Sequence, residues 1–279
     1  MAGSFSNSFA LVKASARVLK MDKQLMVFPL LSGIATVLVT TTFFAPVALL
    51  GGWEMLADDG GGYPGYVFGF LFYLAQYTVI FFFNSALVGA ALIRLDGGNP
   101  TISDGLAIAG KRMGAILGYA VLAATVGVVL NFINERAGFL GRLVAGLVGM
   151  GWRLATYLTV PVLVTKDVGP IDAVKESATL LKQTWGEQVV GNFGLGWATA
   201  MAAISWGLVS AALIAGTATA LPMAVRPAVV ISALGFIFLA LLSSALKGVY
   251  TAALYRYAVT GEEGLFDPEI MDNAFRPKR

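Results

Sequence analysis

The chain has 279 residues, of which 57% are hydrophobic and only 13% are charged, whereas about 25% of residues are charged in soluble proteins. This composition excludes an ordinary soluble domain and indicates a single helical membrane domain. The sequence contains no His and no Cys, which excludes imidazole bases, thiolate nucleophiles, zinc sites built from these residues and the usual ligands of haem and iron–sulfur clusters. We therefore expect no catalytic residues, no metal site, no cofactor and no enzymatic activity.

Long stretches without charge predict six membrane-spanning helices, because a helix needs about 20 apolar residues to cross about 30 Å of hydrocarbon. A membrane barrel would instead show alternating segments of about 10 residues. The predicted fold is therefore all-α, a polytopic membrane helical bundle, with an external turn at 216–222. Its six predicted spans are 25–50, 66–93, 113–134, 143–165, 189–214 and 229–254.

Basic residues are distributed unequally between the two ends of these spans. Fourteen Lys and Arg residues fall on the side that holds both termini, and three, Arg136, Arg142 and Arg226, fall on the other side. Since Lys and Arg accumulate in cytoplasmic loops, both termini are expected to be cytoplasmic. The net charge of +3 is explained by this bias, because the basic residues flank spans and form no nucleic-acid recognition surface.

A short amphipathic helix is predicted before each pair of spans, near 6–22, 101–113 and 170–185. Apolar residues recur there at steps of three, four and three, which is the period of one helix face. The sequence thus predicts three repeats of an interfacial helix followed by a hairpin within 1–258, and a cytoplasmic tail at 259–279. The apolar positions are Phe9, Val12, Ala16 and Leu19, then Leu106, Ala109, Met113 and Ile116, then Ile171, Val174, Ala178 and Leu181.

Basic residues on two of these helices are predicted to contact the anionic inner leaflet, where each is worth about 1 kcal/mol. The alternative is that the helices only anchor and orient the hairpins. The predicted lipid-surface residues are Lys13, Arg17, Lys20, Lys175 and Lys182.

Two segments carry a resemblance to a known group of proteins. The third interfacial helix with its preceding loop, 169–186, and the segment 83–100 resemble parts of an uncharacterised family of six-span bacterial membrane proteins. The pattern formed by Ala173, Ser177, Leu180 and Trp185 is more distantly similar to the membrane domain of some glycerophosphodiester phosphodiesterases. The resemblance implies a fold and a bacterial inner membrane, but no reaction, because the catalytic domain of those enzymes has no counterpart here.

Arg153 is the most unusual single residue, because it falls within the fourth predicted span, where Arg costs about 2.5–3.5 kcal/mol. Gly141, Ala145 and Gly149 precede it at intervals of four, and small residues at that spacing let helices approach closely. We therefore expect Arg153 to face the bundle interior, satisfied by polar groups or backbone carbonyls, or by a bound anion or lipid phosphate. The third alternative is that the boundary of this span is misplaced. The small-residue face could equally join two copies of the chain.

Lys247 lies in the sixth span, where its side chain either extends to the interface or faces a polar path with Ser244. Asn84 and Gln76 are the other predicted pore-lining groups. Two cations without an intramembrane carboxylate would favour anionic cargo. Two functions therefore stay open: a channel or transporter for small anions or anionic lipid headgroups, and a scaffold that binds membrane lipids through its basic helices.

Overall fold

The structure, a computed structural model, describes residues 2–50, 52, 62–136, 138–185, 194–220 and 222–261. Helices and the short turns between them account for these ranges, which contain no strand, so the all-α prediction is confirmed. The helices are α1 (Ala2–Met21), η1 (Lys23–Met26), α2 (Val27–Leu49), α4 (Gly62–Leu95), α5 (Ile102–Lys111), α6 (Met113–Arg136), α7 (Phe139–Ala155), α8 (Thr159–Thr165), α9 (Pro170–Trp185), α10 (Gly194–Ala220), η4 (Pro222–Ala224) and α11 (Val225–Thr260).

Six segments of the described chain are long and apolar enough to cross a membrane, which confirms the predicted number of spans. The fourth segment consists of two helices, α7 and α8, with a turn between them. The molecule is accordingly a multi-pass membrane protein. The six segments are Lys23–Leu49, Gly65–Leu95, Met113–Asn134, Gly141–Thr165, Thr199–Ala218 and Val225–Thr260.

The turn between the last two spans lies later in the chain than predicted. Residues 216–220 continue α10, and the chain reverses around η4. The hydroxyl of Thr217 donates to the carbonyls of Leu213 and Ile214, at 2.9 and 3.0 Å, so this Gly- and Thr-containing stretch stays helical. The predicted external turn at 216–222 is therefore correct only at its end.

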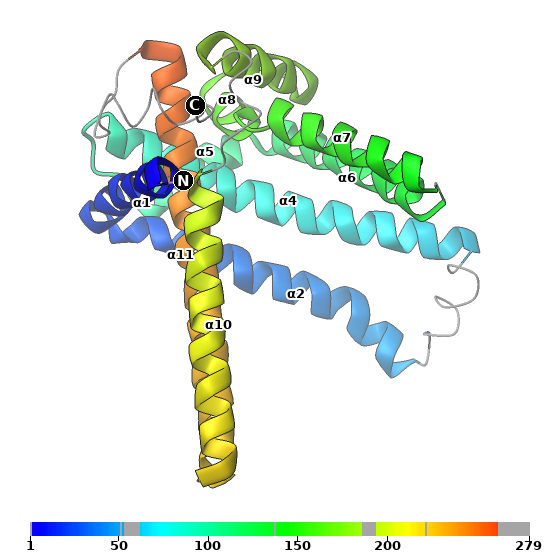
Figure 1. The fold of residues 1–279 in the computed structure, drawn as a ribbon. Coiled ribbons are helices and arrows are strands. Elements are labelled where there is room, and N and C mark those ends of the chain that lie inside the picture. Colours follow the sequence, from blue (N-terminus) through cyan, green and yellow to red (C-terminus); the bar gives the residue numbers. More distant parts are fainter. Residues whose placement is uncertain are drawn as a thin grey trace.

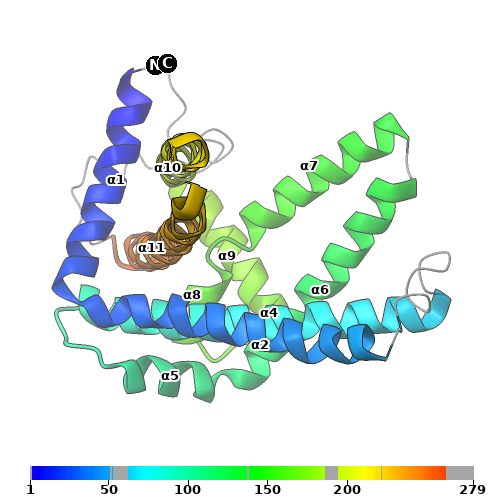
Figure 2. The same cartoon turned by 90° about the horizontal axis from the view of Figure 1, so that it is seen from below.

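Three hairpins diverge from a common region of the molecule. Figure 1 shows α10 and α11 running downward together, while α2, α4, α6 and α7 extend to the right. Figure 2 views the molecule along the α10–α11 hairpin, and α1, α2, α4 and α5 lie across that direction. We call the common region the hub and define it as α1, α5, α8 and α9 packed with the C-terminal halves of α4 and α11.

The centre of the hub is a close crossing of α4 and α11 through small residues. A Cβ atom added at Gly248 of α11 would lie 2.3 Å from Cδ2 of Leu87 on α4, so only glycine fits there without movement. Small residues allow this approach in membrane helices generally. The buried small residues of the two helices are Ser85, Ala86, Ala90 and Ala91 on α4, and Ala245, Ala252 and Ala253 on α11.

Helix α5 is pressed against α4 at a second glycine. A Cβ atom at Gly105 would lie 2.7 Å from the carbonyl oxygen of Ala86 and 2.5 Å from Cζ of Phe28. The helix begins at a capping box, in which the Thr101 hydroxyl accepts the backbone N–H of Asp104 and the Asp104 carboxylate accepts the backbone N–H of Thr101. These two features set where α5 starts and how closely it packs.

The short helices bury faces that differ partly from the predicted ones. On α1, Leu19 is buried as expected, but Ser15 and Val18 form the centre of its buried side. On α9 the buried line is Ala173, Ser177 and Leu181, whereas Ile171 is 58% exposed. Met113 is also exposed at 42% because it begins α6. The side chain of Phe9 lies outside the described side chains.

Candidate functional site

Arg153 lies in the last turn of α7, not midway along a continuous span. The helix ends at Ala155, and the side chain of Arg153 is exposed. A cation at a helix C-terminus is stabilised by the partial negative charge of the terminal carbonyls. The prediction that Arg153 faces the bundle interior is therefore wrong. The side chain is exposed, and it lies where α7 ends next to the hub.

The break after α7 has a clear physical origin. The backbone N–H of Leu158 donates to the hydroxyl of Ser177 on α9, 2.9 Å away, and both residues are fully buried. Pro161 has no N–H to donate to the carbonyl of Tyr157, so a continuous helix would lack a hydrogen bond at that point. Pro161 is the sequence signal that could have predicted the break.

The small-residue face that precedes Arg153 packs within the hairpin as predicted. Ala145 is 4% exposed, and the Cβ position at Gly149 lies 3.6 Å from Cδ1 of Leu130 on α6. The face therefore serves the α6–α7 contact.

The other predicted pore-lining residues lie apart from Arg153. Lys247 and Ser244 are exposed on α11. Oδ1 of Asn84 lies 3.8 Å from the Cβ position at Gly248, within the α4–α11 crossing. Among the described residues, no hydrogen bond or ion pair joins any of them to Arg153.

Gln76 belongs to the α2–α4 hairpin. Its Nε2 donates to the hydroxyl of Thr40 at 2.7 Å and to the carbonyl of Thr36 at 3.3 Å. Interhelical hydrogen bonds of this kind stabilise membrane helix pairs by about 0.6–2 kcal/mol. Gln76 therefore holds two helices together.

The exposed side of α1 carries a row of basic residues. Lys13, Arg17 and Lys20 are all exposed, while the opposite side of the helix, with Val18 and Leu19, is buried against α10 and α11. We call these three cations the basic row. Figure 2 shows α1 lying across the end-on view of α10 and α11.

The remaining predicted lipid-surface residues are on α9. Lys175 and Lys182 are exposed, and Lys175 pairs with Asp172 at 3.3 Å. The neighbouring Asp172 carboxylate reduces the positive charge of this helix. The basic row on α1 is accordingly the stronger cationic feature of the two.

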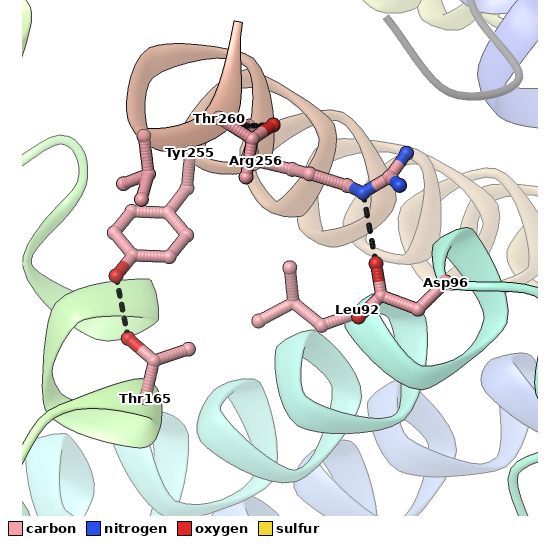
Figure 3. Close-up of a pocket in the computed structure, with 7 residues that line it drawn as sticks. Leu92, Asp96, Thr165, Tyr255, Arg256 and Thr260 are labelled. Atoms are coloured by element: carbon pink, nitrogen blue, oxygen red, sulfur yellow. Dashed lines mark hydrogen bonds and ion pairs between the residues drawn. The ribbon is translucent and has the colours of Figure 1, made fainter. Parts of the chain in front are cut away.

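A pocket of about 220 Å³ opens where the ends of α4, α8 and α11 meet. Figure 3 shows two polar pairs on its wall: Nε of Arg256 donates to Oδ1 of Asp96 at 2.8 Å, and the hydroxyls of Thr165 and Tyr255 lie 2.7 Å apart. Sequence reasoning missed this pocket, because its residues come from three distant helices. Its lining residues are Leu92, Asp96, Thr165, Tyr255, Arg256, Val259 and Thr260.

Two further ion pairs hold the segment after α8 against the hub. Arg112 pairs with Asp167, and Lys166 pairs with Glu176 of α9. The hydrogen bond that the Lys166 ammonium donates to the Glu176 carboxylate raises the pKa of Lys166. Within the part of the chain that the structure describes, no group of three or more Asp or Glu side chains is arranged to hold a metal ion.

Comparison with known proteins identifies the family. The model of a family of unknown function, DUF6159, matches residues 63–265, which is more than half of the chain. The chain belongs to this family. The matched DUF6159 region begins within α4, so α1 and α2 lie before it.

The other comparisons give no relative. No curated protein and no solved structure matches the chain. The more distant resemblance to phosphodiesterase membrane domains stays a prediction.

Proposed function

We propose that the chain is a non-enzymatic membrane scaffold that binds anionic lipid through the basic row of α1. In this proposal the hub and both termini are cytoplasmic, and the membrane is a bacterial inner membrane. The excess of Lys and Arg on the hub side supports this orientation.

One observation carries the proposal. The basic row is exposed, while the opposite side of the same part of α1, with Val18 and Leu19, is buried where α1 packs on α10 and α11. An ordinary interfacial helix inserts its apolar side among lipid chains, but here that side is already occupied by protein. The contact with lipid is therefore electrostatic, and it depends on headgroup charge and ionic strength.

The order of elements supports a repeated design. Short helices α1, α5 and α9 each precede a hairpin, α2–α4, α6–α7 with α8, and α10–α11. We propose that these are three copies of one unit and that the first copy carries the lipid-binding charge. Lys175 and Lys182 of α9 would add a weaker contact.

The anion-channel hypothesis has less support. It depended on a cation that faces the bundle interior, and Arg153 is exposed at the end of α7. Lys247 is exposed on α11 next to the α4–α11 crossing, and its long apolar stem can carry the ammonium toward the interface.

The proposal is tested by lipid binding to the purified full chain in neutral detergent. Fluorescent phosphatidylglycerol and phosphatidylcholine are titrated against wild type and against the triple variant Lys13→Gln, Arg17→Gln, Lys20→Gln. At about 1 kcal/mol for each cation near a lipid surface, the triple variant should weaken phosphatidylglycerol binding by roughly 100-fold.

The matched control neutralises Arg142 and Arg226, which are exposed at the outer ends of hairpins. This double variant should bind phosphatidylglycerol as wild type does. Equal binding of both lipids by wild type, or an unchanged triple variant, would remove the lipid-binding role.

A further inference from the structure

The pocket at the ends of α4, α8 and α11 carries one cation and one anion. The side chain of Arg256 is 16% exposed and that of Asp96 is 64% exposed, so a ligand entering the pocket can reach the Asp96 carboxylate directly. The charges of this pair cancel. A ligand with a single charge would leave one member of the pair poorly matched, whereas a zwitterion can match both.

The other polar groups of the wall are already engaged. The hydroxyls of Thr165 and Tyr255 bond to each other, and that of Thr260 donates to the carbonyl of Arg256 at 2.9 Å. The ionic groups are thus the ones that select the ligand. Leu92 and the 48% exposed Val259 add apolar surface beside them.

The pocket lies at the polar boundary of the membrane segments. Residues 62–93 of α4 carry no charge, and Arg94 and Asp96 follow immediately. Charged residues next to a long apolar stretch mark the headgroup level of a bilayer. A lipid headgroup is therefore the ligand that is most abundant where this pocket opens.

We infer that this pocket binds the headgroup of a zwitterionic phospholipid with a primary ammonium, such as phosphatidylethanolamine. The ammonium donates hydrogen bonds to the carboxylate of Asp96, and the phosphate accepts them from the guanidinium of Arg256. The ion pair between the two side chains opens, and two charge-assisted contacts replace it. Because the site uses neither the basic row nor its charge, the inference is independent of the proposed function.

The number of N–H donors on the cation of the headgroup determines which lipid the pocket prefers. A primary ammonium has three N–H donors, while the quaternary ammonium of phosphatidylcholine has none. Phosphatidylglycerol has the phosphate but no cation for Asp96. The expected order of affinity is therefore phosphatidylethanolamine first, with phosphatidylcholine and phosphatidylglycerol both weaker.

The first experiment uses the wild-type full chain and needs no substitution. Native mass spectrometry measures retention of phosphatidylethanolamine, its N-methyl and N,N-dimethyl derivatives, and phosphatidylcholine, all with identical acyl chains. Affinity should fall along this series by about tenfold in total, the effect of losing one charge-assisted hydrogen bond. Equal retention across the series would overturn the inference.

The second experiment assigns the selectivity to the pocket. Two pocket substitutions are made in the triple variant Lys13→Gln, Arg17→Gln, Lys20→Gln, so that the basic row does not contribute phosphatidylglycerol binding. In that background Asp96→Asn should remove the preference for phosphatidylethanolamine over phosphatidylglycerol, and Arg256→Gln should weaken both lipids. The control is Asp172→Asn, which removes a carboxylate that is 69% exposed on α9 and should leave the preference intact. A folded Asp96→Asn variant that keeps the wild-type preference would overturn the assignment, and if that variant does not fold, the methylation series decides.

Competition with a soluble headgroup tests whether the pocket binds a lipid or a free soluble zwitterion. Glycerophosphoethanolamine has the same ammonium and phosphodiester groups without acyl chains, so it should displace bound phosphatidylethanolamine only weakly. Displacement at concentrations equal to that of the lipid would show that the pocket takes a soluble zwitterion and would overturn the lipid assignment.

Discussion

The backbone N–H of Leu158 donates a hydrogen bond to the hydroxyl of Ser177 across 2.9 Å, at the point where α7 gives way to α8. This contact joins the broken fourth span to α9. It replaces the bond that Leu158 would make within a continuous helix. As a consequence, Arg153 lies at a helix end next to the hub and not within a continuous helix.

Removal of the Ser177 hydroxyl should destabilise the hub. In Ser177→Ala the buried N–H of Leu158 loses its acceptor, which costs about 1–3 kcal/mol. Thermal unfolding in detergent should show a lower midpoint than wild type. The control is Thr179→Ala, because the exposed Thr179 hydroxyl bonds only to its own helix at Lys175; equal midpoints for the two variants would contradict the role of Ser177.

The depth of Arg153 can be measured directly because the chain has no Cys. A single Arg153→Cys variant in liposomes should react with a water-soluble maleimide nearly as fast as Lys175→Cys. Ile237→Cys, near the middle of the apolar part of α11, gives the reference for a deep position. If Arg153→Cys reacts as slowly as Ile237→Cys, the residue is buried among lipid chains and the anion-pathway hypothesis regains its basis.

The crossing of α4 and α11 should tolerate no side chain at position 248. In Gly248→Ala the new Cβ would meet Cδ2 of Leu87 at 2.3 Å and Cγ at 2.8 Å, and overpacking of this kind costs about 1–3 kcal/mol. Unfolding midpoints should fall for Gly248→Ala and recover partly when Leu87→Ala is added. Gly110→Ala is the control, because nothing lies within 4 Å of its Cβ position and alanine favours a helix. If Leu87→Ala restores none of the stability that Gly248→Ala loses, the close contact between these two positions is contradicted.

The first turn of α5 should depend on pH. Hydrogen bonds from the side chain and backbone of Thr101 lower the pKa of the Asp104 carboxyl below its ordinary value of 3.8. A lowered pKa in the folded state means that the capping box contributes stability above pH 3.8, and that this contribution is lost as the pH falls through the lower folded value.

Hydrogen–deuterium exchange at the start of α5 measures this effect. Exchange, corrected for its intrinsic pH dependence, should increase in wild type as the pH falls below 3.8. Asp104→Asn removes the titrating group, so its protection should be lower at neutral pH and should not change in that range. The same pH response in Asp104→Asn would assign the effect to another group.

The number of spans was predictable from the sequence, because every crossing must consist of apolar residues. The chain reversal at Pro222 was placed too early, because Gly216 and Thr217 are compatible with a helix as well as with a turn. The break near Leu158 was predictable from Pro161, but the hydrogen bond that stabilises it was not, because Ser177 lies 19 residues further along the chain. Periodicity reports which residues share a helix face and carries no information on contacts between helices.

The pocket could not be predicted for the same reason. Thr165 and Tyr255 are 90 residues apart, and each is unremarkable in its own segment. The basic row was predictable, since Lys13, Arg17 and Lys20 lie on one side of any helix through them. That the opposite side of α1 is covered by α10 and α11 required the tertiary structure.

The central claim, electrostatic contact between the basic row and anionic lipid at the hub side, is tested most directly in a bilayer. A fluorophore on Gln24→Cys, an exposed position near the basic row, measures energy transfer to headgroup-labelled phosphatidylglycerol present as a minor lipid in phosphatidylcholine nanodiscs. The labelled lipid should be enriched around wild type, and the triple variant should abolish this enrichment. Salt should reduce the enrichment, because the Debye length falls from about 10 Å at 0.1 M to about 3 Å at 1 M. Enrichment that is unaffected by salt and equal in the triple variant would contradict the account.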